Sequence, residues 1–378
     1  MERVFPEDVL AKGERVARTL ALQPVDRVAL HEQLSYNPGV IADWTGKAVS
    51  GFEYAVEDIC SVIRRTLDAC FPPVAPRGTK RITTPDGFVH QHDNWTTWRI
   101  SRPFSDVAGA RQWLLRTLHA WRSERFDPSE ARKRYRRQML DLQALVGETV
   151  IINYSQTHFC SAYDTMGLEL FVYFVDAHPQ DLDDFLEVSV ARELRRIHAV
   201  ADRELSPVIL IAEDFATKQG PLFSPAFLAR YHFPHVRAVT EAWHGHGISV
   251  LYHSDGNYKK VIPDLLACGV DGFYCLEPGV GMDIVGLKNI WPEVVWAGGV
   301  DGVDLLERGT AEQVRAEVHR HIRETNALQT GGMLVASSSE INPPIPPENF
   351  RSMVEAVGEL RNPDFGDSPA RDDDPQSV

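Results

Sequence analysis

Short apolar segments alternate with helical segments along most of the chain after residue 148, and this alternation constrains the fold most. The apolar segments cover residues 149–155, 207–214, 248–255, 272–278, 293–301 and 331–341. Strands that are buried on both faces are continuously apolar, and strands that alternate with helices form parallel sheets. A series of this length favours a closed barrel over an open sheet. We therefore predict an α/β protein with a distorted (β/α)8 TIM-type barrel.

The part of the chain before this series has a different pattern. Segments with helical periodicity are 6–21, 51–70 and 107–146. A short strand is expected at 27–30, and residues 80–100 alternate around a Pro-Asp-Gly turn, which is typical of a β-hairpin. We expect one barrel domain over residues 1–361 with this N-terminal helical and β-hairpin elaboration. The acidic, proline-bearing segment 362–378 is predicted to be a disordered tail.

Composition excludes several classes of function. The formal net charge of −14 disfavours binding to nucleic acid or to an anionic membrane surface. The five cysteines are widely spaced with no Cys-x-x-Cys, which argues against a disulfide framework or a four-cysteine zinc site. The first 20 residues lack the apolar core of a signal peptide, and no run of 18 apolar residues occurs. We predict a cytoplasmic protein, and because no glycine-rich phosphate-binding motif is present, no nucleotide cofactor.

Polar and ionisable side chains follow the ends of most predicted strands. They are His31, Tyr154, Gln156, Glu213, Asp214, His253, Asp255, Asn257, Glu277, Asp301, Ser339 and Glu340. Active sites of TIM barrels lie at the carboxyl ends of the strands, so these residues predict a site at that rim. Each residue alone also has a structural interpretation, because strand-end histidines often only form hydrogen bonds and aspartates often cap helices. The apolar strand interiors make packing alone a poor explanation for the whole set.

The segment His253-Ser254-Asp255-Gly256-Asn257 carries the sharpest chemical pattern. Side chains two residues apart on an extended segment point the same way, so His253 and Asp255 could share a metal ion or relay a proton. Gly256 permits a ligand or another backbone to approach closely. By contrast, Cys275 is interpreted as a small buried hydrophobe, and the basic segment 131–137 as a solvated helix face.

Around these residues the chain resembles the uroporphyrinogen decarboxylase superfamily. The matching stretches include "AEDFATKQGPLFSPAFLARYHFPHVRAV", "VLYHSDGNYKKVIPDLLACGVDGFYCLEP" and "GGMLVASSSEINPPIPPENFRSMVEAV". The resemblance covers residues 10–361 and is strong from residue 207. That superfamily has a distorted barrel and includes corrinoid- and coenzyme M-type methyltransferases, whose zinc is bound by a His-x-Cys motif and a later cysteine. Here His253 is kept, Asp255 stands at the first cysteine position, and Ser339 falls at the second.

True uroporphyrinogen decarboxylases carry an arginine-rich segment after the first strand. This chain has "HEQLSYNPGVIADWTG" there, so it resembles the methyltransferase branch more closely. The resemblance implies methyl transfer from a small methoxy, methylamine or methylthio compound to a corrinoid carried by a partner protein, or to a similar acceptor. It also implies zinc or another divalent metal and a homodimer.

We assign roles to the rim residues on this hypothesis. The metal is assigned to His253 and Asp255. The catalytic residues are expected to be His253, Asp255, Glu213, Asp214 and Glu340, with a carboxyl group protonating the leaving heteroatom. Substrate contacts are assigned to His31, Tyr154, Gln156, Asn257, Glu277, Asp301 and Ser339. Two alternatives remain open: a decarboxylase of a small acid that uses His253 and Asp255 as proton donor and relay, and a non-enzymatic protein that holds a corrinoid or tetrapyrrole.

Overall fold

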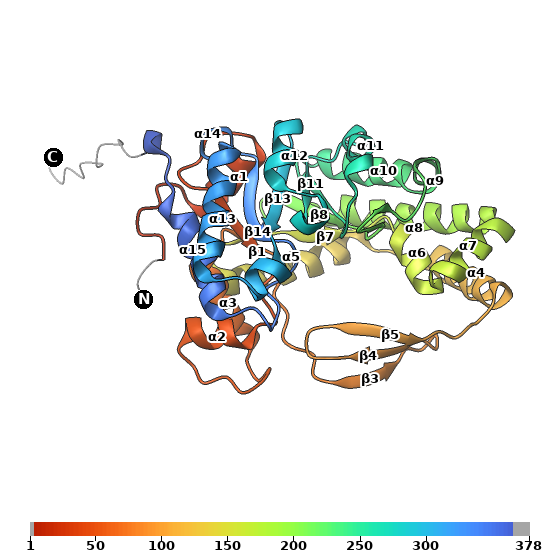
Figure 1. The fold of residues 1–378 in the computed structure, drawn as a ribbon. Coiled ribbons are helices and arrows are strands. Elements are labelled where there is room, and N and C mark those ends of the chain that lie inside the picture. The colour runs from red at the N-terminus through yellow and green to blue at the C-terminus, as the bar shows by residue number, and fades with distance from the viewer. Residues whose placement is uncertain (1–3, 366–378) are drawn as a thin grey trace, which may run out of the picture.

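The centre of the molecule is a sheet of nine short parallel strands (Figure 1), seen in a computed structural model that describes residues 4–365. The strands are β1 (Ala29–Glu32), β2 (Ala69–Cys70), β6 (Val150–Ile151), β7 (Asn153–Ser155), β8 (Val208–Ala212), β11 (Ser249–His253), β12 (Gly272–Tyr274), β13 (Val295–Val300) and β14 (Met333–Ser337). Their order is β6-β2-β1-β14-β13-β12-β11-β8-β7.

The two strands at the ends of this order, β6 and β7, are separated by Ile152 alone. Residues 150–151 pair with β2, and residues 153–155 pair with β8. One extended segment therefore joins both edges of the sheet, and the sheet curls into a barrel. If β6 and β7 are counted as one strand, the nine strands occupy eight positions. The predicted distorted TIM-type barrel is confirmed.

Helices surround the strands (Figure 1). They are α1 (Lys12–Leu20), α2 (Pro38–Thr45), α3 (Val56–Thr66), α4 (Val107–Ser123), α5 (Pro128–Val146), α6 (Phe159–Met166), α7 (Leu168–Ala177), α8 (Pro179–Val200), α9 (Pro225–Tyr231), α10 (Phe233–His244), α11 (Ile262–Ala267), α12 (Ile284–Ile290), α13 (Ala311–Glu324), α14 (Ala327–Thr330) and α15 (Pro347–Glu359). Short helical turns η1 (Lys259–Val261), η2 (Pro278–Val280), η3 (Gly302–Glu307) and η4 (Pro363–Phe365) complete the helical elements. This layer and the barrel interior bury both faces of β8 and β13, in agreement with their continuously apolar sequences.

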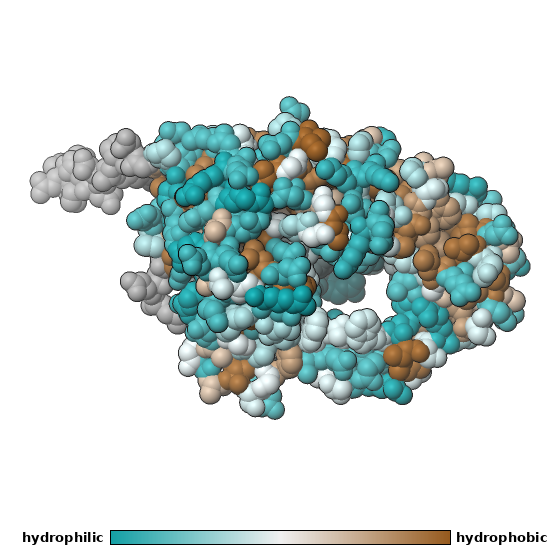
Figure 2. Space-filling model, in the orientation of Figure 1, coloured by the Kyte–Doolittle hydropathy of each residue, from teal (hydrophilic) through white to brown (hydrophobic). Residues whose placement is uncertain are grey.

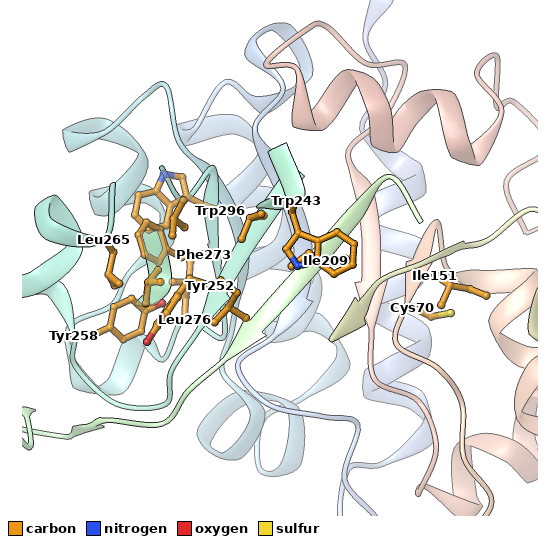
Figure 3. Packing of buried hydrophobic residues seen from close by; sticks show 14 of the residues in the cluster. Cys70, Ile151, Ile209, Trp243, Tyr252, Tyr258, Leu265, Phe273, Leu276 and Trp296 are labelled. Atoms are coloured by element: carbon orange, nitrogen blue, oxygen red, sulfur yellow. The ribbon is translucent and has the colours of Figure 1, made fainter. Parts of the chain in front are cut away.

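Alternation along each strand divides the core into two layers. In β11, Val250 and Tyr252 pack toward the helices, whereas Leu251 belongs to the cluster inside the barrel. The outer layer is rich in aromatic rings, and Figure 3 shows Phe273 beside Trp296, with ring centroids 5.2 Å apart in a stacked arrangement. Burying a side chain of this size stabilises the fold by roughly 1.5–3 kcal/mol. The same alternation decides which residues reach the barrel mouth.

A three-stranded antiparallel sheet is inserted between β2 and α4. Its strands are β3 (Lys80–Thr83), β4 (Val89–His92) and β5 (Thr97–Ser101), and a small ladder elsewhere joins β9 (Ala216–Thr217) to β10 (Gly220–Pro221). Figure 2 shows an opening between the inserted sheet and the rest of the molecule. The hairpin predicted at 80–100 is present, with β5 as a third strand.

Two predictions about element boundaries need correction. The helix predicted over 51–70 ends at Thr66, and Ala69–Cys70 is a barrel strand. The predicted tail at 362–378 begins with structured residues, because Asn362 is buried and Pro363–Phe365 form η4. The rest of that tail, from residue 366, lies outside the described residues. Over residues 4–365, no helix combines the length and apolarity needed to cross a membrane.

Candidate active site

A cavity of about 270 Å³ opens at the carboxyl ends of the barrel strands. It is lined by Gln33, Phe71, Tyr154, Leu210, Ala212, Asp214, His253, Asp255, Tyr274, Cys275, Ser339 and Glu340. Of the residues predicted from the sequence, the structure therefore brings six to one cavity. We call it the catalytic cavity.

Strand alternation explains why these side chains meet. Leu251 faces the barrel interior, so His253 and Asp255, at steps of two, continue the same row to the rim. Leu210 in β8 begins a parallel row that ends at Asp214. Because β8 and β11 are paired neighbours, the two rows place His253 beside Asp214.

His253 lies between two carboxylates. Its Nε2 is 3.2 Å from Asp214 Oδ1 and 3.8 Å from Asp255 Oδ1. Burial disfavours the imidazolium form, but the hydrogen bond and charge of Asp214 and the charge of Asp255 outweigh it and raise the pKa of His253 above its usual value. The other ring nitrogen, Nδ1, is buried without a hydrogen-bond partner among the described residues. Asp214 thus orients the ring, and Nδ1 remains free.

Cys275 joins this group from the neighbouring strand. Its Sγ is 3.1 Å from Asp255 Oδ1 and 2.8 Å from the carbonyl oxygen of Ser338. One ligand atom each from His253, Asp255 and Cys275 lies within 4.8 Å of the others. Burial and the charge of Asp255 raise the pKa of the thiol well above its usual value, so without a cation the thiol donates hydrogen bonds.

The interpretation of Cys275 as a small buried hydrophobe overlooked its position at the cavity. Tyr274 and Cys275 are consecutive, yet both line the catalytic cavity, which regular strand alternation does not allow. The backbone of Cys275 has φ of 67°, in the left-handed region, directly after β12 ends at Tyr274. This reversal breaks the alternation. The available signal in the sequence was a cysteine near the end of the predicted strand that follows the one ending at His253.

Glu340 closes the opposite side of the cavity, after β14. Burial and the negative charge of Asp255 raise the pKa of Glu340, while His253 lowers it by less. The adjacent residue, Ser339, is fixed because its carbonyl oxygen accepts hydrogen bonds from Tyr274 (2.9 Å) and Ser337 (2.8 Å). Glu340 therefore retains its proton to a higher pH than an exposed glutamate, which suits a proton donor.

Glu213 lies outside the cavity lining and has a positioning role. It is 2% exposed, and its carboxylate accepts hydrogen bonds from the backbone amides of residues 157, 158 and 160 at 2.7, 3.0 and 2.8 Å. Thr157 Oγ1 donates to it as well, at 2.7 Å. These amides lie in and directly before the first turn of α6, where a carboxylate stabilises the helix. With both oxygens engaged, Glu213 anchors the loop that follows β7.

The loop after Asp255 is held by residues predicted to contact substrate. Glu277 Oε1 accepts a hydrogen bond from the amide of Gly256 at 2.6 Å, and Asn257 Nδ2 donates to the carbonyl of Val280 at 2.8 Å. Gly256 has φ of 77°, and a Cβ there would lie 2.7 Å from the carbonyl oxygen of Thr217. The close approach that glycine permits is therefore made by another backbone segment, β9.

Three further predicted contacts, Asp301, His31 and Gln156, also lie outside the lining. Asp301 caps η3 by accepting hydrogen bonds from the amides of residues 303 and 304 at 2.9 and 2.7 Å. His31 is buried between Phe71 and Tyr274, with ring centroids 4.6 and 5.2 Å away. Burial lowers the pKa of His31 to about 4, so this ring is neutral. Gln156 faces a separate, larger cavity.

Comparison with known proteins identifies the family that this chain matches. The family model for uroporphyrinogen decarboxylase (URO-D) matches residues 155–360, more than half of the chain. No curated protein sequence matches significantly. Among solved structures, a methyltransferase from Methanosarcina mazei is similar with a TM-score of 0.64 and 17% identity, over 93% of this chain and 99% of that one.

A second solved structure is much less similar. It is a probable 3-DHS dehydratase from Bacillus anthracis, with a TM-score of 0.32 and 13% identity over 60% of this chain and 81% of that one. A TM-score this low carries no argument about fold or activity. At 17% identity, the similarity to the Methanosarcina protein concerns the fold alone.

Proposed function

Because this chain belongs to the uroporphyrinogen decarboxylase family, we propose that it is a methyltransferase of that family. Its donor is a small methoxy, methylamine or methylthio compound, and its acceptor is a corrinoid on a partner protein or a similar nucleophile. The observation that carries this proposal is the convergence of His253, Asp255 and Cys275 at one side of the catalytic cavity. The fold shared with the Methanosarcina methyltransferase supports it.

The donor set fits zinc. Zinc in proteins takes imidazole nitrogen, thiolate sulfur and carboxylate oxygen, and a catalytic zinc has three protein ligands and one open position. His253, Asp255 and Cys275 offer one of each, with the catalytic cavity beside them. Cys275 thus supplies from β12 a thiolate that the His-x-Asp motif on β11 lacks. Asp214 lies 3.2 Å from Nε2 of this histidine and orients its ring in the metal-free protein.

When bound there, zinc would supply Lewis acidity that polarises the heteroatom carrying the methyl group. The remaining steps are assigned to the protein's own side chains. The rings of Phe71, Tyr154 and Tyr274 form an apolar wall around the methyl group and exclude water. Glu340 donates its proton to the heteroatom as the bond to the methyl group breaks. The methyl group passes to the acceptor, so the donor leaves as an alcohol, amine or thiol.

The charge of the catalytic cavity argues against the alternative decarboxylase. A carboxylate substrate needs a cationic partner in a desolvated site. Among the described residues that line the cavity, none is arginine or lysine, while Asp214, Asp255 and Glu340 are acidic. An anionic substrate would therefore meet repulsion from the cavity walls, whereas a neutral or cationic donor would not.

Metal content tests the ligand set. The purified protein is expected to contain about one zinc per chain by elemental mass spectrometry, and Cys275→Ala and His253→Ala should lose it. Cys268→Ser is the matched control, because its thiol also donates to a carbonyl, that of Phe233 at 3.3 Å, but lies outside the cavity. Zinc retained in Cys275→Ala would remove Cys275 from the ligand set.

Methyl transfer is tested by mixing the zinc-loaded protein with reduced cobalamin and one donor of each class. The expected result is a change of the cobalt absorption spectrum with one class and not with the others. Glu340→Gln should slow that reaction while the zinc content stays unchanged. No spectral change with any of the three donor classes, for a protein loaded with zinc, would contradict methyl transfer to a corrinoid.

A further inference from the structure

A second cavity of about 510 Å³ lies beside the catalytic cavity, outside the barrel strands. It is formed between α5 and α8, the segment that joins α4 to α5, and the end of β7 with the residues after it. Tyr154 lines both cavities. A volume of this size accommodates an organic molecule rather than a single ion. We call it the arginine cavity.

The walls of the arginine cavity carry positive charge in a chain that is otherwise acidic. Four arginines line it, namely Arg134, Arg192, Arg195 and Arg196, against two glutamates, Glu124 and Glu193. His158 adds no charge near neutral pH, because burial lowers the pKa of its imidazole. The local balance is therefore +2, whereas the whole chain carries −14.

Two of the arginines are fixed by the two glutamates. Arg196 forms a two-pronged pair with Glu193, at 2.6 and 2.7 Å. Arg192 pairs with Glu124 at 2.7 Å and lies over the ring of Trp121, with its guanidinium carbon 4.5 Å from the ring centroid. These contacts hold both guanidinium groups in place, and both carboxylates are engaged in ion pairs.

The other two arginines, Arg134 and Arg195, have no carboxylate partner within 4 Å among the described residues. They come from facing helices, α5 and α8, and both side chains are exposed at the cavity. Arginine matches carboxylate and phosphate oxygens with two parallel hydrogen bonds. Two unpaired guanidinium groups on opposite walls therefore suit a group with two negative charges.

The remaining lining suits the body of an organic molecule. Phe126, Ala131 and Val200 supply an apolar surface, and Tyr135 keeps a hydroxyl proton to donate because its oxygen accepts the hydrogen bond from Asn153. A solvated helix face explains the basic segment 131–137 in general but not this cavity. Arg134 is the member of that segment that lines the arginine cavity together with arginines of α8.

We propose that the arginine cavity binds an organic dianion, a molecule with an apolar body and two negative charges on a phosphate monoester or a pair of carboxylates. The acidic side chains of the catalytic cavity repel such a group. The arginine cavity therefore favours anionic ligands that the catalytic cavity disfavours. Since Tyr154 separates them, a molecule bound by the arginines lies one aromatic ring from the proposed reaction site. Its binding rests on these side chains and does not require that the methyl transfer proposal be correct.

Binding is tested by calorimetric titration of the full-length protein with four probes. Phenyl phosphate and phthalate represent the two sources of double charge, benzoate carries one charge, and inorganic phosphate lacks the apolar body. The expected result is that one aromatic dianion binds at least about tenfold more tightly than benzoate, since one charge-assisted contact is worth about that factor. It should also bind more tightly than inorganic phosphate, and the better of phenyl phosphate and phthalate identifies the charged group.

Variants locate the bound probe. Arg134→Gln and Arg195→Gln are each expected to weaken binding about tenfold, and the double variant should abolish it. Arg137→Gln is the matched control, because Arg137 is exposed on the same helix and does not line the arginine cavity. Binding that survives the double variant, or no binding of either dianion at millimolar concentration, would overturn the proposal. Cys275→Ala should lose zinc but keep the dianion, which separates this proposal from the function proposed above.

Discussion

The two ends of the barrel differ in how their charged residues are paired. At the amino-terminal end, Arg15 and Arg27 are buried and bind Asp26 and Asp68 at 2.6–2.8 Å. Asp8 joins this network through Arg27 and through Arg361, at 2.8 and 2.6 Å. Three arginines thus balance three aspartates. At the carboxyl-terminal end, three acidic side chains surround one histidine and one cysteine, with no arginine or lysine in the lining.

The charges at the amino-terminal end stabilise the fold, whereas those at the carboxyl-terminal end suit the binding of a ligand. Buried charges are tolerated when each has a partner with good geometry. The network at the amino-terminal end meets that condition within the chain itself. The catalytic cavity does not meet it with its own side chains, and this excess of negative charge fits the metal site proposed above.

Breaking the amino-terminal network should have the largest effect on stability. Asp68 accepts hydrogen bonds from both buried arginines and from the amide of Leu30. Asp68→Ala removes the carboxylate that both buried guanidinium groups share and is expected to lower the free energy of unfolding by about 3–5 kcal/mol. Urea unfolding measures this. Asp304→Ala, which removes an exposed pair with Arg308, should change it by less than about 1 kcal/mol. Equal effects of the two variants would contradict the comparison.

Removing a charge from the catalytic cavity should weaken metal binding and should not destabilise the metal-free protein. Asp255→Asn is expected to weaken zinc binding by about 100-fold. In the metal-free protein the same change relieves repulsion among the acidic side chains and should raise the free energy of unfolding by about 0.5–1 kcal/mol. Zinc titration and urea unfolding in chelator test both parts. A metal-free variant that is markedly less stable than the metal-free wild type would show that Asp255 supports the fold.

Acid should reduce the free energy of unfolding that Asp26 contributes at the amino-terminal end. Burial opposes ionisation of Asp26, but its hydrogen bonds and charge pairing with Arg15 lower its pKa from 3.8 to about 2. A lowered pKa means that the contribution is complete above about pH 4 and is lost as the pH falls toward 2. The expected loss is about 2 kcal/mol. Unfolding measured from pH 5 to pH 2 should show a loss in the wild type that exceeds the loss in Asp26→Asn by about this amount.

Raising the pH should reduce the free energy of unfolding through Glu32. Glu32, at the carboxyl end of β1, is buried, and burial raises its pKa from 4.5 to about 8, despite its hydrogen bonds from Ser337. A raised carboxyl pKa means that stability falls as the pH rises from about 4.5 to 8, because only the unfolded chain ionises freely there. Glu32→Gln should therefore be more stable than the wild type at pH 9 and similar to it at pH 4. A difference in stability between the two proteins that does not change with pH would contradict the raised pKa of Glu32.

The barrel and half of the site could be predicted from local patterns alone. Continuous apolar runs mark β8, β11, β13 and β14, and the step of two along β11 brings His253 and Asp255 to the same cavity. The strand β2 could not be found this way, because two residues are too few to carry a pattern. Helical periodicity from α3 extends into it and hides it.

The rest of the site depends on structure that no periodic pattern encodes. Cys275 reaches the cavity through one left-handed residue after β12. Glu213 and Asp301 have the composition of catalytic residues, but backbone amides engage their carboxylates, and those amides come from loops whose paths are set by packing. The arginine cavity combines Arg134 and Arg195 from helices about 60 residues apart, so only the fold shows them together.

The seam that closes the barrel has a consequence for motion. The bonds from the amides of Val150 and Ile152 to the carbonyls of Asp68 and Cys70, both 2.9 Å, join β6 to the two-residue strand β2. The other neighbour of β2 is β1, which pairs with it at two positions. Amide protons along this seam should exchange with solvent before those of β8, β11 and β13. Tyr154 stands directly after the seam, so the wall between the two cavities is attached to the part of the barrel that opens most easily.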